Sequence, residues 1–351
     1  MIPICLNLFL LAYTILFRSH HKGSQTDPAK TLILGTLGLF GINMILAIGL
    51  SHDLFDLMSL LSWGIFLHMP FFLLWYGAKI FVPRKRLALM AMGLALLILS
   101  IGVDAFLIEP QWLDVTRVTL PNPKLDQSIR IAVLADIQTD APGDYEARVF
   151  ARVKKEQPDL IVFLGDTIQT PEKAFGPAAK KLNTLLQEAA LQPRLGMFAV
   201  QGNVDHNDWP QVFAGLKVTT LQETQTIDLG PLTLTGLSFA ESRQTALTLE
   251  PQEKYHLVLG HCPDYALGHT HADLMLAGHT HGGQVRLPGI GPLLTYTEVP
   301  KAWASGLTQV TPNQTLYVSR GIGMERGHAP RLRFLCRPEL LILTLTPQDQ
   351  N

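Results

Sequence analysis

Two histidines in the last third of the chain, His279 and His281, have a spacing that suits metal binding. They follow the apolar run Leu274–Ala277 and lie between glycines, in the stretch Ala-Gly-His-Thr-His-Gly-Gly-Gln. Alternate side chains of an extended segment point the same way, so both imidazoles can reach one point. The glycines let the backbone turn tightly and approach a bound ion. Imidazole binds Zn, Mn, Fe and Ni, so the pair is a candidate metal site, with a polar surface loop as the alternative.

Four other short segments, each with a continuously apolar centre, also end in residues that can bind a metal. These segments cover residues 129–135, 160–164, 196–201 and 256–259, and they are typical of buried strands. The residues that follow them are, in the same order, Asp136, Asp166, Asn203 and His261. Gly-Asp and Gly-Asn are ordinary turn sequences. Five strand ends that all carry ligand-type residues nevertheless favour a metal centre, because sites in such sheets form at the carboxyl ends of strands.

Helical patterns separate the first of these strands. They cover Tyr145–Glu156 and Glu172–Ala190, and a series of β-like segments follows from Val218 to Phe239. A further strand is predicted at Val115–Leu120, just after the composition changes at Glu109. Alternating strands and helices indicate an α/β domain, which we place at residues 115–351.

The first 110 residues form a membrane anchor by composition. Only 16% of the chain is charged, against about 25% in soluble domains. Four apolar segments account for the deficit, at residues 1–17, 31–50, 57–82 and 87–108. About 20 apolar residues cross a bilayer, so the last three are long enough and the first is at the short limit. No Lys or Arg precedes the first segment, which argues against a signal peptide. We predict four spans, with three as the alternative.

The charges of the loops predict the orientation. The loops from Arg18 to Lys30 and from Pro83 to Arg86 are basic, whereas the loop from Ser51 to Asp56 contains no Lys or Arg. The positive-inside rule places both basic loops in the cytoplasm. Both termini, and with them the α/β domain, are then expected outside the inner or cell membrane.

Several function classes are disfavoured. A net charge of −1 provides no field that attracts nucleic acid. Polar residues within the spans are few, chiefly Asn43, His68 and Asp104, which argues against a channel or transporter; Asn43 is more simply a helix–helix hydrogen bond. Three cysteines form no disulfide framework, and a Cys262–Cys336 bridge stays open. The expected partner at this point is the bilayer, with no nucleic acid and no obligate protein partner.

The order of these motifs resembles that of the calcineurin-like metallophosphoesterases. It runs Asp-x-x, Gly-Asp, Gly-Asn-x-Asp, Gly-His and Gly-His-Thr-His-Gly-Gly-Gln. The likeness is greatest to a membrane-anchored bacterial branch, related to phosphodiesterases that hydrolyse UDP-diacylglucosamine. It extends from Val115 to Thr346 and includes residues 316–323 and 337–339 near the end. The resemblance implies two mixed β-sheets packed face to face and flanked by helices.

The resemblance also implies two divalent ions, which could be Mn, Zn, Fe or Mg. One ion would be held by Asp136, Asp166 and His281. The other would be held by Asp166, Asn203, His261 and His279, with Asp166 as the bridge. A pair of cations about 3.5–4 Å apart can clamp a phosphoryl oxygen and activate a hydroxide for attack on phosphorus.

Two positions depart from the family pattern. Gln138 stands where a histidine is usual, and its amide oxygen could bind loosely, favour a harder ion such as Mn²⁺ or Mg²⁺, or not bind. Val204 stands where the general-acid histidine would be, and the loss of a general acid typically costs about 10²–10⁴-fold in rate. His206 is a candidate replacement, with a solvated loop histidine as the alternative. Asp205 is expected to orient the turn, and Asn203 remains a catalytic candidate.

The candidate substrate contact is Arg320, one of several arginines near the C-terminus that could hold phosphate oxygens. The sequence thus predicts a membrane-anchored phosphoesterase that hydrolyses a phosphodiester or pyrophosphate, a lipid-linked one among the candidates, by attack of a metal-bound hydroxide. The alternative is a domain that binds metal but turns over poorly and serves as a binding or sensing module.

Overall fold

The computed structural model describes residues 2–20 and 27–348. The chain forms two compact units, which are described separately. The helical unit contains Met1–Ile108 and the short segment Gly327–Arg331, and the α/β unit contains Glu109–Arg326 and Leu332–Asn351. The predicted basic loop between the first two helices lies largely in residues 21–26, outside the described residues, as does the end of the chain at 349–351.

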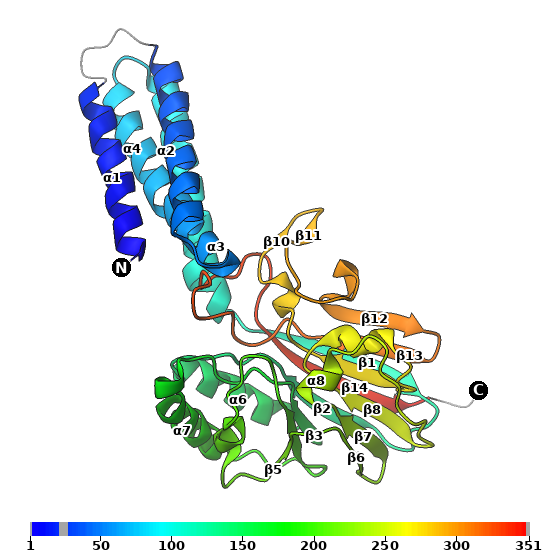
Figure 1. Cartoon of the computed structure of the whole chain (residues 1–351). Coiled ribbons are helices and arrows are strands. Elements are labelled where there is room, and N and C mark those ends of the chain that lie inside the picture. Colours follow the sequence, from blue (N-terminus) through cyan, green and yellow to red (C-terminus); the bar gives the residue numbers. More distant parts are fainter. Residues whose placement is uncertain (1, 21–26, 349–351) are drawn as a thin grey trace. The chain divides into compact units, whose positions relative to one another are not determined.

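The helical unit consists of long apolar helices, two of which contain a π-helical turn (Figure 1). Its elements are α1 (Ile2–His20), α2 (Pro28–Leu50), α3 (Leu54–Trp63), η1 (Gly64–His68), α4 (Met69–Ile80), α5 (Lys85–Val103) and η2 (Asp104–Ile108). Within the described residues, three continuous helical stretches are long and apolar enough to cross a membrane: Pro28–Leu50, Leu54–Ile80 and Lys85–Gln111. The apolar part of α1, Pro3–Phe17, is shorter, so the fourth span stays a prediction.

Polar side chains inside these helices join one helix to another. The Asn43 amide donates to the Leu61 carbonyl at 3.2 Å. His68 Nε2 and Asn7 Oδ1 are hydrogen-bonded at 2.7 Å. Such bonds are the usual role of isolated polar groups in membrane helices, and the one predicted for Asn43 is confirmed.

The α/β unit is built on two six-stranded sheets, as the resemblance implied. The first has the order β1 (Asp114–Asn122), β14 (Glu339–Pro347), β2 (Ile129–Leu134), β3 (Leu160–Phe163), β4 (Met197–Val200), β5 (Val218–Leu221). The second has the order β12 (Gly306–Thr311), β13 (Gln314–Val318), β9 (Leu274–Ala277), β8 (Tyr255–Leu259), β7 (Leu232–Gly236), β6 (Gln225–Asp228). Antiparallel pairs occur at β14–β2, β12–β13 and β6–β7, and the other neighbours are parallel.

The two sheets bury each other, which explains the continuously apolar strands. Side chains such as Val162 and Leu257, from opposite sheets, belong to one hydrophobic cluster. A second cluster packs the other face of the first sheet against α6 (Asp144–Glu156) and α7 (Glu172–Ala189) (Figure 1). The central strands of the first sheet are therefore covered on both faces, and their side chains are mostly apolar until the strands end.

Shorter elements connect these layers. They are η3 (Glu109–Gln111), η4 (Trp209–Phe213), α8 (Phe239–Ser242), η5 (Pro263–Leu267), η6 (His281–Gly283), η7 (Lys301–Trp303) and the hairpin β10 (Arg286–Leu287) with β11 (Gly291–Pro292). Strand β1 continues through Pro121, where the sequence predicted its end. Strand β14 was not predicted, although it lies between β1 and β2 in the first sheet.

Candidate metal centre

Three of the predicted ligands meet directly. Asp166 follows β3, His261 follows β8 and His279 follows β9. One potential ligand atom from each of these side chains lies within 4.8 Å of the others. Two of the strands belong to one sheet and one to the other, so the meeting point lies where the ends of both sheets come together.

Asn203, after β4, completes this group. Its side-chain oxygen lies 2.9 Å from His261 Nε2 and 2.7 Å from His279 Nδ1. Asp166 Oδ2 lies 3.3 Å from the same His261 nitrogen. All four side chains that the resemblance assigned to one ion are therefore adjacent.

Backbone carbonyls determine which nitrogen each histidine presents. His261 Nδ1 donates to the Leu164 carbonyl at 2.7 Å, which leaves Nε2 toward Asp166 and Asn203. His279 Nε2 donates to the Tyr296 carbonyl at 3.2 Å, which leaves Nδ1 toward Asn203. Metal-binding histidines are commonly oriented by such a bond from the second nitrogen.

Asp136 is fully buried beside this group. Its carboxylate accepts the backbone N–H of His279 at 2.9 Å, and its Oδ1 lies 4.0 Å from His261 Nδ1. Gly278 leaves room for this approach, because a Cβ there would lie 2.7 Å from Asp136 Oδ2. The first strand end thus reaches the same cluster from the neighbouring turn.

Gln138 has the features of a neutral oxygen ligand. It is fully buried, and its amide nitrogen donates to Gln169 at 2.9 Å and to Glu325 at 3.0 Å. Its amide oxygen is also buried but has no hydrogen-bond partner. An unsatisfied buried oxygen costs about 1–3 kcal/mol, which a bound cation would offset. The donor set therefore fits a divalent ion, and Gln138 Oε1 is an oxygen with no other partner that such an ion could use.

His281 is buried, and a buried arginine lies behind it. Its Nδ1 is 3.5 Å from the Arg333 guanidinium, which also donates to the carbonyls of Gly323 and Cys336. Burial, together with that guanidinium, lowers the pKa of His281 well below its usual value. The imidazole is therefore held neutral, the form that binds a metal.

The backbone around the cluster is in an uncommon conformation. Among the described residues, positive φ angles occur at five of the predicted ligands: Asp136 (48°), Gln138 (38°), Asp166 (52°), His279 (68°) and His281 (50°). Each such residue typically costs about 1–3 kcal/mol and persists only where its surroundings hold it. Strain of this kind gathers at functional sites, which supports a functional role for the cluster.

The carboxylate of Asp205 holds two of the ligand turns together. It accepts the backbone N–H groups of Asp166 (2.7 Å), Thr167 (2.8 Å) and Gly202 (2.9 Å), and the Thr167 hydroxyl (2.7 Å). Only glycine fits at position 202, because a Cβ there would collide with Asp166 Oδ1. Asp205 therefore orients the turns that carry Asp166 and Asn203, as expected from the sequence.

We expect Asp205→Ala to lower the free energy of unfolding by about 3–5 kcal/mol, because it leaves buried donors without an acceptor. Bound metal should be lost in parallel, since Asp166 loses its backbone anchor. Thermal unfolding and elemental analysis measure the two effects. The exposed neighbour Asp208→Ala is the control. An unchanged melting temperature in Asp205→Ala would show that the anchor is dispensable.

Electrostatics in the cluster favour bound cations. Burial raises the pKa of Asp136 to about 7, against the opposing effect of His261. Burial by itself would lower the pKa of His261. The negative charges of Asp166 and Asp136 outweigh the effect of burial and raise this pKa to about 9. Burial and His261 lower the pKa of His279 to about 4. The cluster thus retains protons that balance the negative charge of its buried carboxylates. Bound divalent cations would supply this positive charge in place of the protons.

Two other predicted residues are engaged elsewhere. His206 Nε2 donates to the Thr170 carbonyl at 2.9 Å, and its ring packs on Phe175 with centroids 4.7 Å apart. The Arg320 guanidinium lies 2.8 Å from Asp114 and 3.1 Å from Glu339, and so links β1 with β14. The structure does not bring either side chain into the histidine cluster described above.

Several supporting residues were missed by the sequence. Glu325 and Gln169 hold Gln138. Arg333 is one of the C-terminal arginines that the sequence offered as phosphate contacts, with surface charge as the alternative, and it is fully buried. These residues lie in loops without a periodic pattern, and only the nearby glycines marked the segment. Cys262 and Cys336 are both buried free thiols, so the bridge left open by the sequence is absent.

The sequence is similar to those of known proteins. The sequence model of the calcineurin-like phosphoesterase family matches residues 129–283. Phosphodiesterase YaeI of Escherichia coli is 41% identical over 254 residues, covering 68% of this chain and 90% of the relative. The uncharacterized metallophosphoesterase YkuE of Bacillus subtilis is 28% identical over 264 residues, or 68% of this chain and 87% of the relative. A transmembrane protein with a metallophosphoesterase domain from Danio rerio is 25% identical over 314 residues, covering 76% and 69%.

Proposed function

The chain belongs to the calcineurin-like phosphoesterases and is a metal-dependent hydrolase of phosphoric esters, and on that premise we propose that it cleaves a phosphodiester or pyrophosphate carried by a membrane lipid. The observation that carries the proposal is the adjacency of Asp166, Asn203, His261 and His279 at the ends of strands from both sheets. The long apolar helices support a substrate held in the membrane.

The residues divide into two ligand sets around a shared carboxylate. Asp136, Gln138 and His281 would hold one cation with Asp166, and Asn203, His261 and His279 would hold the other. Two such ions, when bound, neutralise the charge of the phosphoryl oxygens and lower the pKa of a water near phosphorus. Asp166 would offset the repulsion between such ions. Asn203 and Gln138 would contribute oxygen without adding negative charge.

The position of Val204 bears on the leaving group. Its backbone N–H donates to Asp166 Oδ1 at 2.9 Å, so its side chain extends from a residue that contacts the metal ligands. Valine cannot donate a proton to a departing alkoxide. A substrate whose leaving group is already stable, such as a pyrophosphate or an aryl ester, suffers least from this. Val204 therefore favours a pyrophosphate over an alkyl diester among the candidate substrates.

The test compares substrate classes on purified full-length protein with Mn²⁺. We expect hydrolysis of an aryl phosphodiester and of phospholipid-like pyrophosphates, and little hydrolysis of soluble nucleotides. His279→Ala should abolish the signal. Hydrolysis of soluble nucleotides alone would overturn the lipid assignment. Equal signals from the native chain and His279→Ala would show that the cluster does not catalyse the hydrolysis. The alternative, a module that binds metal and senses a ligand, would then remain.

The α/β domain is proposed to lie outside the cytoplasm. The basis is that the loop Pro83–Arg86 is basic, whereas the loop before α3 contains no Lys or Arg. We expect a C-terminal alkaline phosphatase fusion to be active and a C-terminal green fluorescent protein fusion to be dark in a bacterial host, because the first folds only outside and the second only inside. The reverse pattern would place the domain in the cytoplasm.

A further inference from the structure

Two π-helical turns bring aromatic side chains together in the helical unit. Phe66 belongs to η1 and Phe106 to η2, and their rings meet edge to face with centroids 5.5 Å apart. π-Helical turns inside α-helices are rare and often occur at functional sites, because they re-aim side chains at the cost of regular hydrogen bonding. Both rings line a cavity of about 710 Å³, a volume in the range of small-molecule sites.

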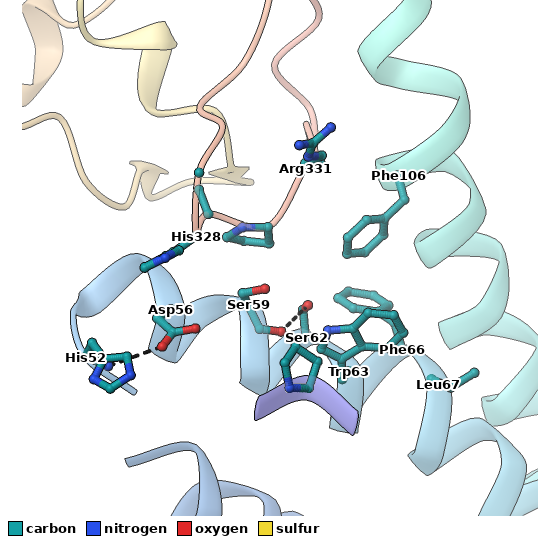
Figure 2. A pocket seen from close by; sticks show the side chains of 14 residues that line it. His52, Asp56, Ser59, Ser62, Trp63, Phe66, Leu67, Phe106, His328 and Arg331 are labelled. Atoms are coloured by element: carbon teal, nitrogen blue, oxygen red, sulfur yellow. Dashed lines mark hydrogen bonds between the residues drawn. The ribbon is translucent and has the colours of Figure 1, made fainter. Parts of the chain in front are cut away.

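The cavity has a polar side and an apolar side (Figure 2). His52, Asp56 and His328 gather on one side in Figure 2, whereas the apolar wall is formed by Trp63, Phe66, Leu67 and Phe106. Arg331 lies between the two sides in the same view. All of these residues belong to the helical unit, because the segment Gly327–Arg331 is part of it. The cavity thus has the amphiphilic character of a lipid, with charge at one side and apolar surface at the other.

The position along the helices also fits a lipid. The lining residues come from the beginning of α1, from the region between His52 and Leu67, and from η2 at the end of the last span. These segments share one end of the bundle, opposite the basic loop Pro83–Arg86. Trp63 and Leu67 remain 40% and 47% exposed. Tryptophan is typical of the membrane–water boundary, so the cavity lies where a headgroup would meet its acyl chains.

We propose that this cavity binds a phospholipid whose headgroup carries both a phosphate and a primary ammonium group. The acyl chains lie against Phe66 and Phe106. The Arg331 guanidinium binds the phosphate, since its planar donors match phosphate oxygens. The Asp56 carboxylate, one oxygen of which accepts the His52 N–H at 3.2 Å, attracts the ammonium. A headgroup with both charges matches both side chains, whereas a purely anionic headgroup places negative charge beside Asp56.

The cavity segment is joined in sequence to residues that support the metal ligands. Immediately before it, Arg326 donates from Nε to the Gln138 carbonyl at 2.9 Å. Two residues after it, Arg333 contacts His281. A lipid that fixes the position of Arg331 therefore restrains a segment whose sequence neighbours hold ligands of the proposed metal centre. The proposal concerns binding, and it stands or falls separately from hydrolysis.

Trp63 provides the readout, because bromine atoms on acyl chains quench tryptophan fluorescence on contact. Full-length protein in detergent is titrated with phosphatidylethanolamine or phosphatidylglycerol that carry identical brominated chains. The Trp63 signal is the difference between the native chain and Trp63→Phe. We expect this signal to saturate, with at least tenfold tighter binding of phosphatidylethanolamine. Arg331→Gln should weaken binding of both lipids about tenfold, or roughly 1.4 kcal/mol.

Two further variants complete the test. Asp56→Asn should remove the preference for phosphatidylethanolamine, because it weakens binding of that lipid and does not weaken binding of phosphatidylglycerol. Arg86→Gln, an exposed arginine at the start of α5 that does not line the cavity, should behave like the native chain. Quenching that rises linearly with lipid and is equal for both headgroups would show partition into the micelle and overturn the proposal. Tighter binding of phosphatidylglycerol would overturn it as well.

Discussion

Asp166→Asn should reduce hydrolysis of an aryl phosphodiester by about 10³-fold or more, because the carboxylate that we propose to be shared by two cations becomes a neutral amide. Loss of several kcal/mol of charge stabilisation corresponds to that factor, at about 1.4 kcal/mol for each tenfold change. Bound metal should fall from two equivalents to one or fewer, as measured by elemental analysis at saturating Mn²⁺. The amide oxygen can still accept the Val204 N–H, so the turn itself should persist.

The matched control for this variant is Asp228→Asn. Asp228 is exposed and forms an ion pair with Lys254 at 2.7 Å. Its activity and metal content should equal those of the native chain. If Asp166→Asn retained two equivalents of metal and activity within tenfold of native, Asp166 would not bridge two ions.

Val204→His is expected to increase the turnover of alkyl phosphodiesters by about 10²-fold, because it supplies a general acid where the family usually has one. The substituted side chain extends from a backbone already anchored to Asp166, and Val204 is only half-buried, so an imidazole can be accommodated. Pyrophosphate substrates, with their better leaving groups, should gain little. Turnover numbers measured on a series of leaving groups test this directly.

Val204→Gln separates proton donation from polarity. Glutamine introduces a polar side chain that cannot transfer a proton near neutral pH, so it should leave alkyl ester hydrolysis unchanged. The gain in Val204→His should also disappear above the pKa of the new imidazole, because the neutral ring has lost the proton it donates. An equal gain in both variants would show that polarity, and not proton donation, raises turnover. No gain in either would mean that the native chain already has another acid.

The sequence predicted the strand ends that carry the candidate metal ligands, because burial on both faces leaves a clear signature. The strands before Asp166 and His279 are continuously apolar, and the strand before Asp136 is apolar except for Arg130. The helices between the first strands show a regular pattern. Polar residues stand out where such strands stop. Parallel pairing then brings those ends to one edge, which is why residues more than 100 positions apart could be assigned to one cluster.

Other features could not be read from the sequence, for identifiable reasons. Strand β14 pairs with β1 and β2 from the far end of the chain, and nothing local indicates its neighbours. Gln138 could not be assigned, because its role depends on Glu325 and Gln169, which occupy its amide nitrogen from distant loops. His206 and Arg320 have suitable chemistry, but tertiary contacts with Thr170 and Glu339 direct them elsewhere.

The most direct test of the metal centre is anomalous diffraction from crystals of the Mn²⁺-loaded protein. We predict two manganese peaks about 3.5–4 Å apart, joined by the Asp166 carboxylate. One peak should contact Gln138 Oε1 and His281, and the other His261 Nε2 and His279 Nδ1. A single peak, or two peaks without Asp166 between them, would contradict the account.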